Sequence, residues 1–196
     1  MRSERRELYF VATILAATLA AGGYFAYRHR APSPDRVAAH TAAWLDGPRA
    51  TAKMMMERYG SPNALGDGSA TWYERGPWKR ITIRGGEHFD YLEQTVGYFI
   101  PVDAVEPLRA FGHGLRFDRI DDELTATSNS EALNILALNL ADDVASARRA
   151  APDAAELYVR TARLAAAGKS SPLLDRLQFE PYRPATETPW NREIAY

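Results

Sequence analysis

The distribution of hydrophobic and polar positions divides this chain into an apolar run near the N-terminus and a longer segment of mixed character. Residues 8–26, LYFVATILAATLAAGGYFA, carry no charged side chain, although 25% of the chain is charged. A helix of this length spans roughly the hydrocarbon core of a bilayer, and its backbone hydrogen bonds are satisfied internally. The pattern therefore predicts one transmembrane helix over residues 8–26, through which the chain contacts the lipid bilayer.

Aromatic and cationic residues follow this apolar run. Five of them have side-chain types that gather at membrane–water interfaces: Tyr24, Phe25, Tyr27, Arg28 and Arg30. A cleaved signal peptide is the alternative, because a basic N-terminal region precedes the run and small residues at 20–22 would suit a peptidase. The apolar run continues past those small residues, which favours a retained anchor.

The short basic tail before the run sets the expected orientation. Residues 1–7 are arginine-rich and therefore poorly suited to export, so we expect them in the cytoplasm. Residues 27–34 contain two prolines and predict a short, stiff spacer. Together these features predict a single-pass protein of the inner membrane whose remaining residues lie in the periplasm.

Beyond the spacer, the hydrophobic period changes from helical to strand-like and back, which predicts one α+β domain over residues 35–179. Ile81 and Ile83 alternate with charged or hydroxyl neighbours, as in a strand with one buried and one wet face. We expect helices at 35–45, 48–59, 103–112, 130–147 and 152–168, and strands at 70–73, 79–84, 89–99, 115–120 and 123–127. The expected fold is a small antiparallel sheet packed against several helices.

The segment after Ser130 has the clearest helical pattern. Its apolar residues recur at steps of three and four: Leu133, Leu136, Ala137, Leu140, Val144 and Ala147. Asn134 and Asn139 interrupt this pattern, and buried amides require hydrogen-bond partners. We therefore expect both asparagines to fix how strands or loops meet this helix, with recognition of a small ligand as the alternative.

The last residues, 180–196, predict an extended arm. Its three prolines oppose helix formation and central-strand pairing. The arm also carries three bulky aromatic side chains suited to a partner's pocket: Tyr182, Trp190 and Tyr196. A frayed terminus is the alternative, but this aromatic content favours a docking element.

Charge and cysteine content exclude several classes of protein. The 24 basic and 25 acidic residues are interspersed and give a formal net charge of −1, so the concentrated basic surface required by nucleic acid is absent from the sequence. The chain has no cysteine, which excludes disulfides, thiolate metal sites and cysteine nucleophiles. With only four scattered histidines, we expect neither a metal site nor a cofactor.

One predicted hairpin combines aromatic and cationic side chains. These residues are Trp72, Tyr73, Trp78, Lys79 and Arg80. Because aromatic residues and arginine are enriched at protein interfaces, the hairpin is a candidate partner-binding surface; a half-buried sheet face with cation–π contacts is the alternative. The sequence contains no nucleophile elbow, phosphate-binding loop or identifiable nucleophile–base pair, so it indicates no catalytic residue.

Four segments together resemble one protein family. They are 76–80 (GPWKR), 92–94 (LEQ) with Tyr98, 134–141 (NILALNLA) and 177–179 (LQF). In this order they are similar to a family of small exported or membrane-anchored bacterial proteins of unknown function, over about residues 45–180. The resemblance implies a single α+β domain behind an N-terminal hydrophobic segment, and it implies no activity.

These expectations favour an interaction protein. The first hypothesis is a non-catalytic accessory subunit of a larger membrane complex, such as a respiratory or photosynthetic assembly, acting through contacts with other membrane-protein subunits. The alternative is a free-standing periplasmic binding or envelope-maintenance domain that the anchor only localises. A small hydrolase is the third hypothesis, and the missing nucleophile–base pair disfavours it.

Overall fold

The computed structural model describes residues 31–87 and 89–183. The anchor over 8–26 and several expected contact residues lie outside these ranges and remain predictions: Tyr24, Phe25, Tyr27, Arg28, Arg30, Trp190 and Tyr196. Within the described ranges, no helix combines the length and the apolar character needed to cross a bilayer.

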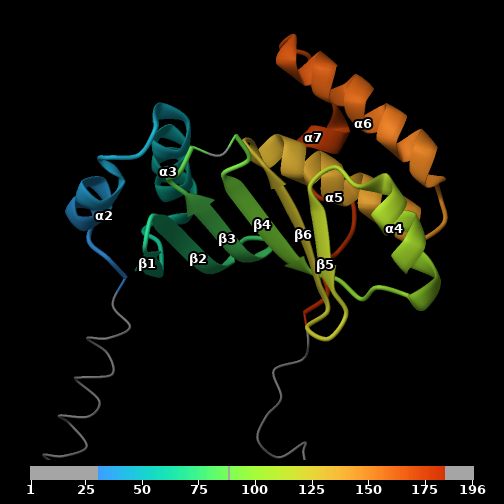
Figure 1. Ribbon diagram of the computed structural model, residues 1–196, viewed down its shortest axis with the longest axis horizontal. Helices are drawn as coiled ribbons and strands as arrows, with labels where there is room; N and C mark the ends of the chain where they lie inside the picture. Colours follow the sequence, from blue (N-terminus) through green and yellow to red (C-terminus); the bar gives the residue numbers. More distant parts are fainter. Residues whose placement is uncertain (1–30, 88, 184–196) are drawn as a thin grey trace, which may run out of the picture.

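Six strands form one sheet, which confirms the α+β class (Figure 1). They are β1 (Ala64–Gly66), β2 (Ser69–Arg75), β3 (Trp78–Arg84), β4 (Leu92–Gly97), β5 (Leu115–Asp118) and β6 (Glu123–Ser128). Their order is β1-β2-β3-β4-β6-β5, and every neighbouring pair is antiparallel. The first four strands follow chain order, whereas β6 enters beside β4 and leaves β5 at the edge.

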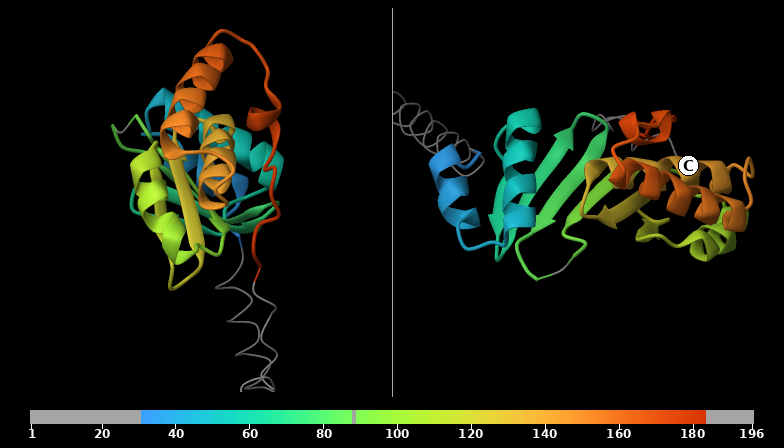
Figure 2. Two further views of the ribbon diagram at one scale, coloured as in Figure 1. Left: turned by 90° about the vertical axis from the view of Figure 1, so that its right-hand side faces the viewer. Right: turned by 90° about the horizontal axis from the view of Figure 1, so that it is seen from above.

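The helices lie before, between and after the strands. They are α2 (Pro34–Thr41), α3 (Asp46–Tyr59), the 3-10 turn η1 (Val102–Ala104), α4 (Val105–Phe111), α5 (Glu131–Ala145), α6 (Ala151–Ala166) and α7 (Pro172–Asp175). Helices α3 and α5 pack against the sheet, and α4, α6 and α7 surround α5 (Figures 1 and 2). In the described part of the chain, no helix covers the other face of the central strands.

The two-residue period of the strands separates apolar from polar side chains. Ile81 and Ile83 of β3, together with Leu92 of β4 and Leu124 of β6, are fully buried beneath the helices. Residues between them along the strands are threonines or charged residues that point to the other face. The alternation expected at Ile81 and Ile83 is therefore confirmed.

Helix α5 forms the centre of the core. Residues 134–142 are all buried, because the sheet, α4, α6 and α7 contact the helix on different sides. Leu136 and Leu140, which belong to the predicted apolar stripe, have no exposed surface.

The two asparagines of α5 hold neighbouring segments, as the sequence predicts. Asn134 Nδ2 donates to the carbonyl oxygen of Leu92 in β4 at 3.1 Å. Asn139 Nδ2 donates to the carbonyl oxygens of Leu173 and Arg176, at 3.0 and 2.9 Å, and so holds the segment around α7 against α5. These bonds confirm the structural role expected for both amides.

Some boundaries differ from the sequence expectation. Strand β1 and helix α7 are too short to produce a periodic pattern, and the sequence does not predict them. Strand β4 begins at Leu92 rather than at residue 89. Helix α2 begins at Pro34 and is capped by Ser33, whose side chain accepts from the Arg36 amide.

Replacing a core leucine of α5 tests this packing. We expect Leu136→Ala to lower the free energy of unfolding by about 2–5 kcal/mol, because the surrounding core cannot fully close the cavity. Denaturant unfolding followed by tryptophan fluorescence measures the change. The control Leu164→Ala removes an exposed side chain of α6 and should change stability by less than about 0.5 kcal/mol. Equal effects of the two variants would contradict the packing described.

Candidate functional site

The carboxylate of Glu131, the first residue of α5, gathers four hydrogen-bond donors. Its Oε1 atom accepts from Tyr59 Oη at 2.7 Å, Trp78 Nε1 at 2.9 Å and Gln94 Nε2 at 3.1 Å. Its Oε2 atom accepts from an Arg58 guanidinium nitrogen at 2.8 Å. A helix N-terminus also favours negative charge. The carboxylate thus joins α3, β3 and β4 to α5.

The Glu131 carboxylate determines the orientation of two buried amides. Because an ionised carboxylate only accepts hydrogen bonds, Gln94 must present its Nε2 group to it. The Gln94 Oε1 atom then faces inward and accepts from Asn134 Nδ2 at 3.0 Å. Asn134 Oδ1 is left buried without a partner in the described part of the chain. A polar network therefore runs through the core from Arg58 at the surface to Asn134.

A pocket of about 350 Å³ opens beside Glu131, between α3, the β2–β3 turn and residues 175–183. Its charged lining residues are Arg58, Arg176, Arg183, Glu131, Asp175 and Glu180. Because cations and carboxylates occur there in equal number, the lining suits a polar ligand of low net charge. Trp78 contributes its buried ring to one wall.

The first residues of the C-terminal arm lie against the domain. The Tyr182 amide donates to the Gly97 carbonyl oxygen at 2.8 Å, and Arg183 donates to the Gly76 carbonyl oxygen at 2.7 Å. A Cβ atom at Gly97 would lie 1.8 Å from the Tyr182 carbonyl oxygen, so only glycine permits this approach. The prolines predict no pairing with the sheet, and residues 180–183 form no strand; the bond from Tyr182 is a single backbone contact at the end of β4.

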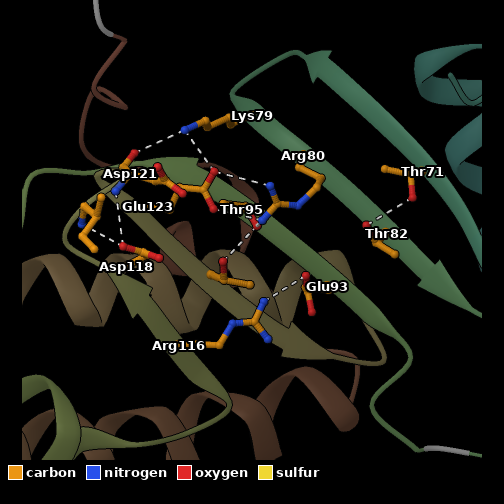
Figure 3. A network of polar contacts seen from close by, with 12 residues as sticks. Thr71, Lys79, Arg80, Thr82, Glu93, Thr95, Arg116, Asp118, Asp121 and Glu123 are labelled. Atoms are coloured by element: carbon orange, nitrogen blue, oxygen red, sulfur yellow. Dashed lines mark hydrogen bonds and ion pairs between the residues drawn. The ribbon is translucent and has the colours of Figure 1, made fainter. Parts of the chain in front are cut away.

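The uncovered side of the sheet is a second candidate site, which we call the open face. It consists of Thr71, Tyr73, Lys79, Arg80, Thr82, Arg84, Glu93, Thr95, Arg116, Asp118, Glu123, Thr125 and Thr127, most of which Figure 3 labels. Strand register places Arg80, Thr95, Thr125 and Arg116 in one row across four strands. The two threonine hydroxyls lie 2.9 Å apart and are buried beneath the longer side chains.

Ion pairs order the charged residues of the open face. Lys79 and Arg80 each lie 3.0 Å from Glu123, and Arg116 and Arg84 lie 3.1 and 3.8 Å from Glu93. Burial opposes ionisation of Glu123, but hydrogen bonds from Arg80 and Lys79 outweigh it and lower the pKa of the carboxyl below its ordinary value. A shallow cavity of about 230 Å³ lies between Arg80 and Arg116. The arrangement is a preformed polar surface.

The structure divides the residues of the predicted partner-binding hairpin. Trp72 and Trp78 are buried in the core, and Trp72 Nε1 donates to the Gly60 carbonyl oxygen at 2.8 Å. Their assignment to a recognition surface is therefore wrong, because neither indole is accessible. Lys79 and Arg80 do lie together on the open face (Figure 3), and strand register places Tyr73 opposite Arg80. Tyr182 is also exposed, but it belongs to the arm.

Sequence reasoning does not identify Glu131, Glu93, Glu123 or Arg116 as site residues. Arg58 and Glu131 are separated by 73 positions, so no local spacing connects them. One feature of the sequence could have identified Glu131: it is a carboxylate at the start of the most apolar helix, where a buried charge needs hydrogen-bond partners. For Glu93, an acidic residue inside a buried strand gives the same signal.

No protein-family model, curated protein or solved structure matches this chain. The family resemblance noted from the four sequence segments therefore stays a prediction. In the ranges that the structure describes, no three His, Asp or Glu side chains are placed to hold a metal ion together. The candidate sites are defined by their geometry alone.

Neutralising Glu131 tests its role as the connecting carboxylate. In Glu131→Gln, an NH2 group replaces one of the two oxygen atoms that accept hydrogen bonds from four donors. The new group can only donate, so we expect a loss of about 1–3 kcal/mol in the free energy of unfolding. Urea unfolding measures it. The control Glu106→Gln alters an exposed carboxylate paired with Arg109 and should cost at most about 1 kcal/mol. A Glu131→Gln variant as stable as the parent would refute this role.

The alkaline stability of the domain tests the Tyr59–Glu131 bond. Burial and the hydrogen bond to Glu131 raise the pKa of Tyr59 to about 12, so the folded chain retains a proton that the unfolded chain releases near pH 10. This contribution is complete below about pH 10 and is lost as the pH rises toward 12.

We expect Tyr59→Phe to flatten the fall in unfolding free energy across this window, measured by urea unfolding at a series of pH values. A residual slope remains, because burial and the hydrogen bond to Asp142 also raise the pKa of Tyr98. An identical slope in parent and variant would show that Tyr59 does not contribute.

Proposed function

We propose that this chain is a non-catalytic, single-pass accessory subunit of a larger membrane protein complex and that a partner subunit covers its open face. The observation that carries this proposal is the open face itself. One side of the sheet packs beneath helices, whereas the other presents ordered charged and hydroxyl side chains without a covering element in the described ranges. Association through such a surface requires contact rather than chemistry.

The ion pairs of the open face support recognition of a protein. Glu93 and Glu123 are largely buried and fix their cationic partners in place, which reduces the side-chain entropy lost on binding. Arginine and tyrosine are the side chains that most often carry interface energy, and Arg80, Arg116 and Tyr73 occupy this face. The surface is thus prepared before a partner arrives.

Charge balance on the open face indicates the character of the partner. Four cations, Lys79, Arg80, Arg84 and Arg116, share two carboxylates. Asp118 adds a third carboxylate to the open face, so one positive charge remains in excess, which favours an acidic or hydrogen-bond-accepting protein surface. The rest of the C-terminal arm, with Trp190 and Tyr196, extends the same hypothesis beyond the described residues.

The alternative function is a free-standing periplasmic binding domain. The pocket beside Glu131 favours it, since about 350 Å³ lined by both apolar and oppositely charged side chains can hold a small molecule. Under this alternative the anchor only localises the domain. The two functions differ in the surface they use, so variants on the open face distinguish them.

Two arginine variants with similar exposure test the proposal. Arg116 lies on the open face with 62% of its side chain exposed, and Arg109 lies on α4 with 64% exposed. Arg116 pairs with Glu93, which also pairs with Arg84, and Arg109 pairs with Glu106, which is exposed. We expect Arg116→Ala to weaken association with the complex by roughly tenfold or more, as loss of an interface arginine does. Arg109→Ala should leave association unchanged.

The measurement is co-migration of the full chain with a large complex on native gels after mild-detergent extraction of the membranes, followed by mass spectrometry. Urea unfolding verifies that both variants are folded. Migration of the parent chain by itself would overturn the accessory-subunit proposal and favour the binding domain. Equal retention of the two variants would overturn the assignment of the open face.

A further inference from the structure

Three loop segments meet at one end of the sheet. The Tyr98 amide donates to the Asp122 carbonyl oxygen at 2.7 Å, which joins the segment after β4 to the β5–β6 turn. Arg119 Nε donates to the Ile100 carbonyl oxygen at 3.3 Å and strengthens the same junction. The bond from Tyr182 to Gly97 adds the start of the arm at 2.8 Å. Residues far apart in sequence are thereby brought together.

Each of these segments exposes a large apolar side chain. Phe99 is 65% exposed, Val102 73%, Ile120 93% and Tyr182 46%; we call these four residues the apolar tip. The β5–β6 turn holds Ile120 outward, because Asp118 Oδ1 accepts from the Ile120 amide at 2.7 Å and fixes the turn. Exposed apolar residues on segments that meet at one end of a polar domain are typical of a surface that contacts another phase or molecule.

We propose that the apolar tip inserts into the interfacial layer of the bilayer that holds the N-terminal anchor. The inference rests on the anchor of the proposed function and adds an orientation to it. Between the end of the predicted anchor at Ala26 and residue 31, the chain can span at most about 18 Å. Residue 31 and residue 183, the two ends of the described chain, leave the domain on the same side as the β5–β6 turn (Figures 1 and 2). The side bearing the tip therefore faces the membrane.

The charges around the apolar tip define the kind of lipid contact. The charged residues of these segments, or bonded to them, are Lys79, Arg119, Arg183, Asp103, Asp118, Asp121 and Asp122. Cations and carboxylates largely offset one another, so attraction to anionic headgroups contributes little. Insertion is driven by the burial of apolar side chains and is therefore expected in zwitterionic lipid as well.

Because the chain has no cysteine, one introduced cysteine can carry a single fluorescent label. We label Ile120→Cys and Val102→Cys with an environment-sensitive dye in the full chain, reconstituted into phosphatidylcholine vesicles. Leu164→Cys is the matched control, since Leu164 is also exposed but lies near the end of α6, on the opposite side of the domain (Figure 1). Lipids carrying a spin label near the headgroup serve as the quencher.

We expect spin-labelled lipid to quench the labels at 102 and 120 severalfold more strongly than the label at 164. The same ratio should hold when a part of the phosphatidylcholine is replaced by phosphatidylglycerol. Combining Phe99→Ser and Val102→Ser with the Ile120→Cys label should reduce quenching, because both substitutions remove exposed apolar area without touching the core. An unchanged signal would mean that the dye, rather than the tip, seeks the lipid, and would overturn the proposal.

Alkaline carbonate extraction separates the tip from the anchor. A chain that resists extraction but shows equal quenching at 120 and 164 keeps its anchor and overturns the proposed insertion. A water-soluble quencher gives a second test. If the labels at 102 and 120 are shielded from it in native membranes but not in pure lipid vesicles, the tip contacts a protein partner, and the proposed insertion is overturned. A chain that is extracted refutes the anchor on which the proposal depends.

Discussion

The carboxylate of Glu131 belongs to α5 and accepts hydrogen bonds from α3, β3 and β4, so four elements meet at two oxygen atoms. A largely buried charge is costly unless donors surround it, and here four donors do so. The same acceptor fixes the amide of Gln94 and, through it, that of Asn134. One carboxylate thus links the sheet to its central helix through hydrogen bonds to both of its oxygen atoms.

The sheet itself has two different faces. The covered face is apolar except for the network that begins at Glu131, and it supplies the hydrophobic core. The open face carries threonines and charges, yet Thr95 and Thr125 at its centre are as buried as core residues because arginines lie over them. Ion pairs order the charges of this face, whereas the helical side is already filled by the core.

Both ends of the described chain and the β5–β6 turn, which carries Ile120, lie on one side of the domain, which gives the proposed functions a common geometry. A domain held close to the bilayer by its tip would present the open face sideways, toward neighbouring membrane subunits. Asn139 adds a link between the core and the arm, because it holds residues around α7 that lead to the pocket and to Tyr182. The anchor, the apolar tip and the arm would then together set the orientation of the domain relative to the bilayer.

The sequence by itself determined the class of fold and most helices and strands, because hydrophobic period and turn residues act locally. The apolar stripe of α5 and the alternation of apolar and polar residues in β3 follow directly from the sequence. It also determined the structural role of Asn134 and Asn139 from their polarity in an apolar helix. Only the tertiary structure decided which aromatic residues are buried, removing Trp72 and Trp78 from the surface. It alone revealed the Glu131 network, the order of β4, β6 and β5 and the apolar tip, because their contacts join distant segments that no local pattern records.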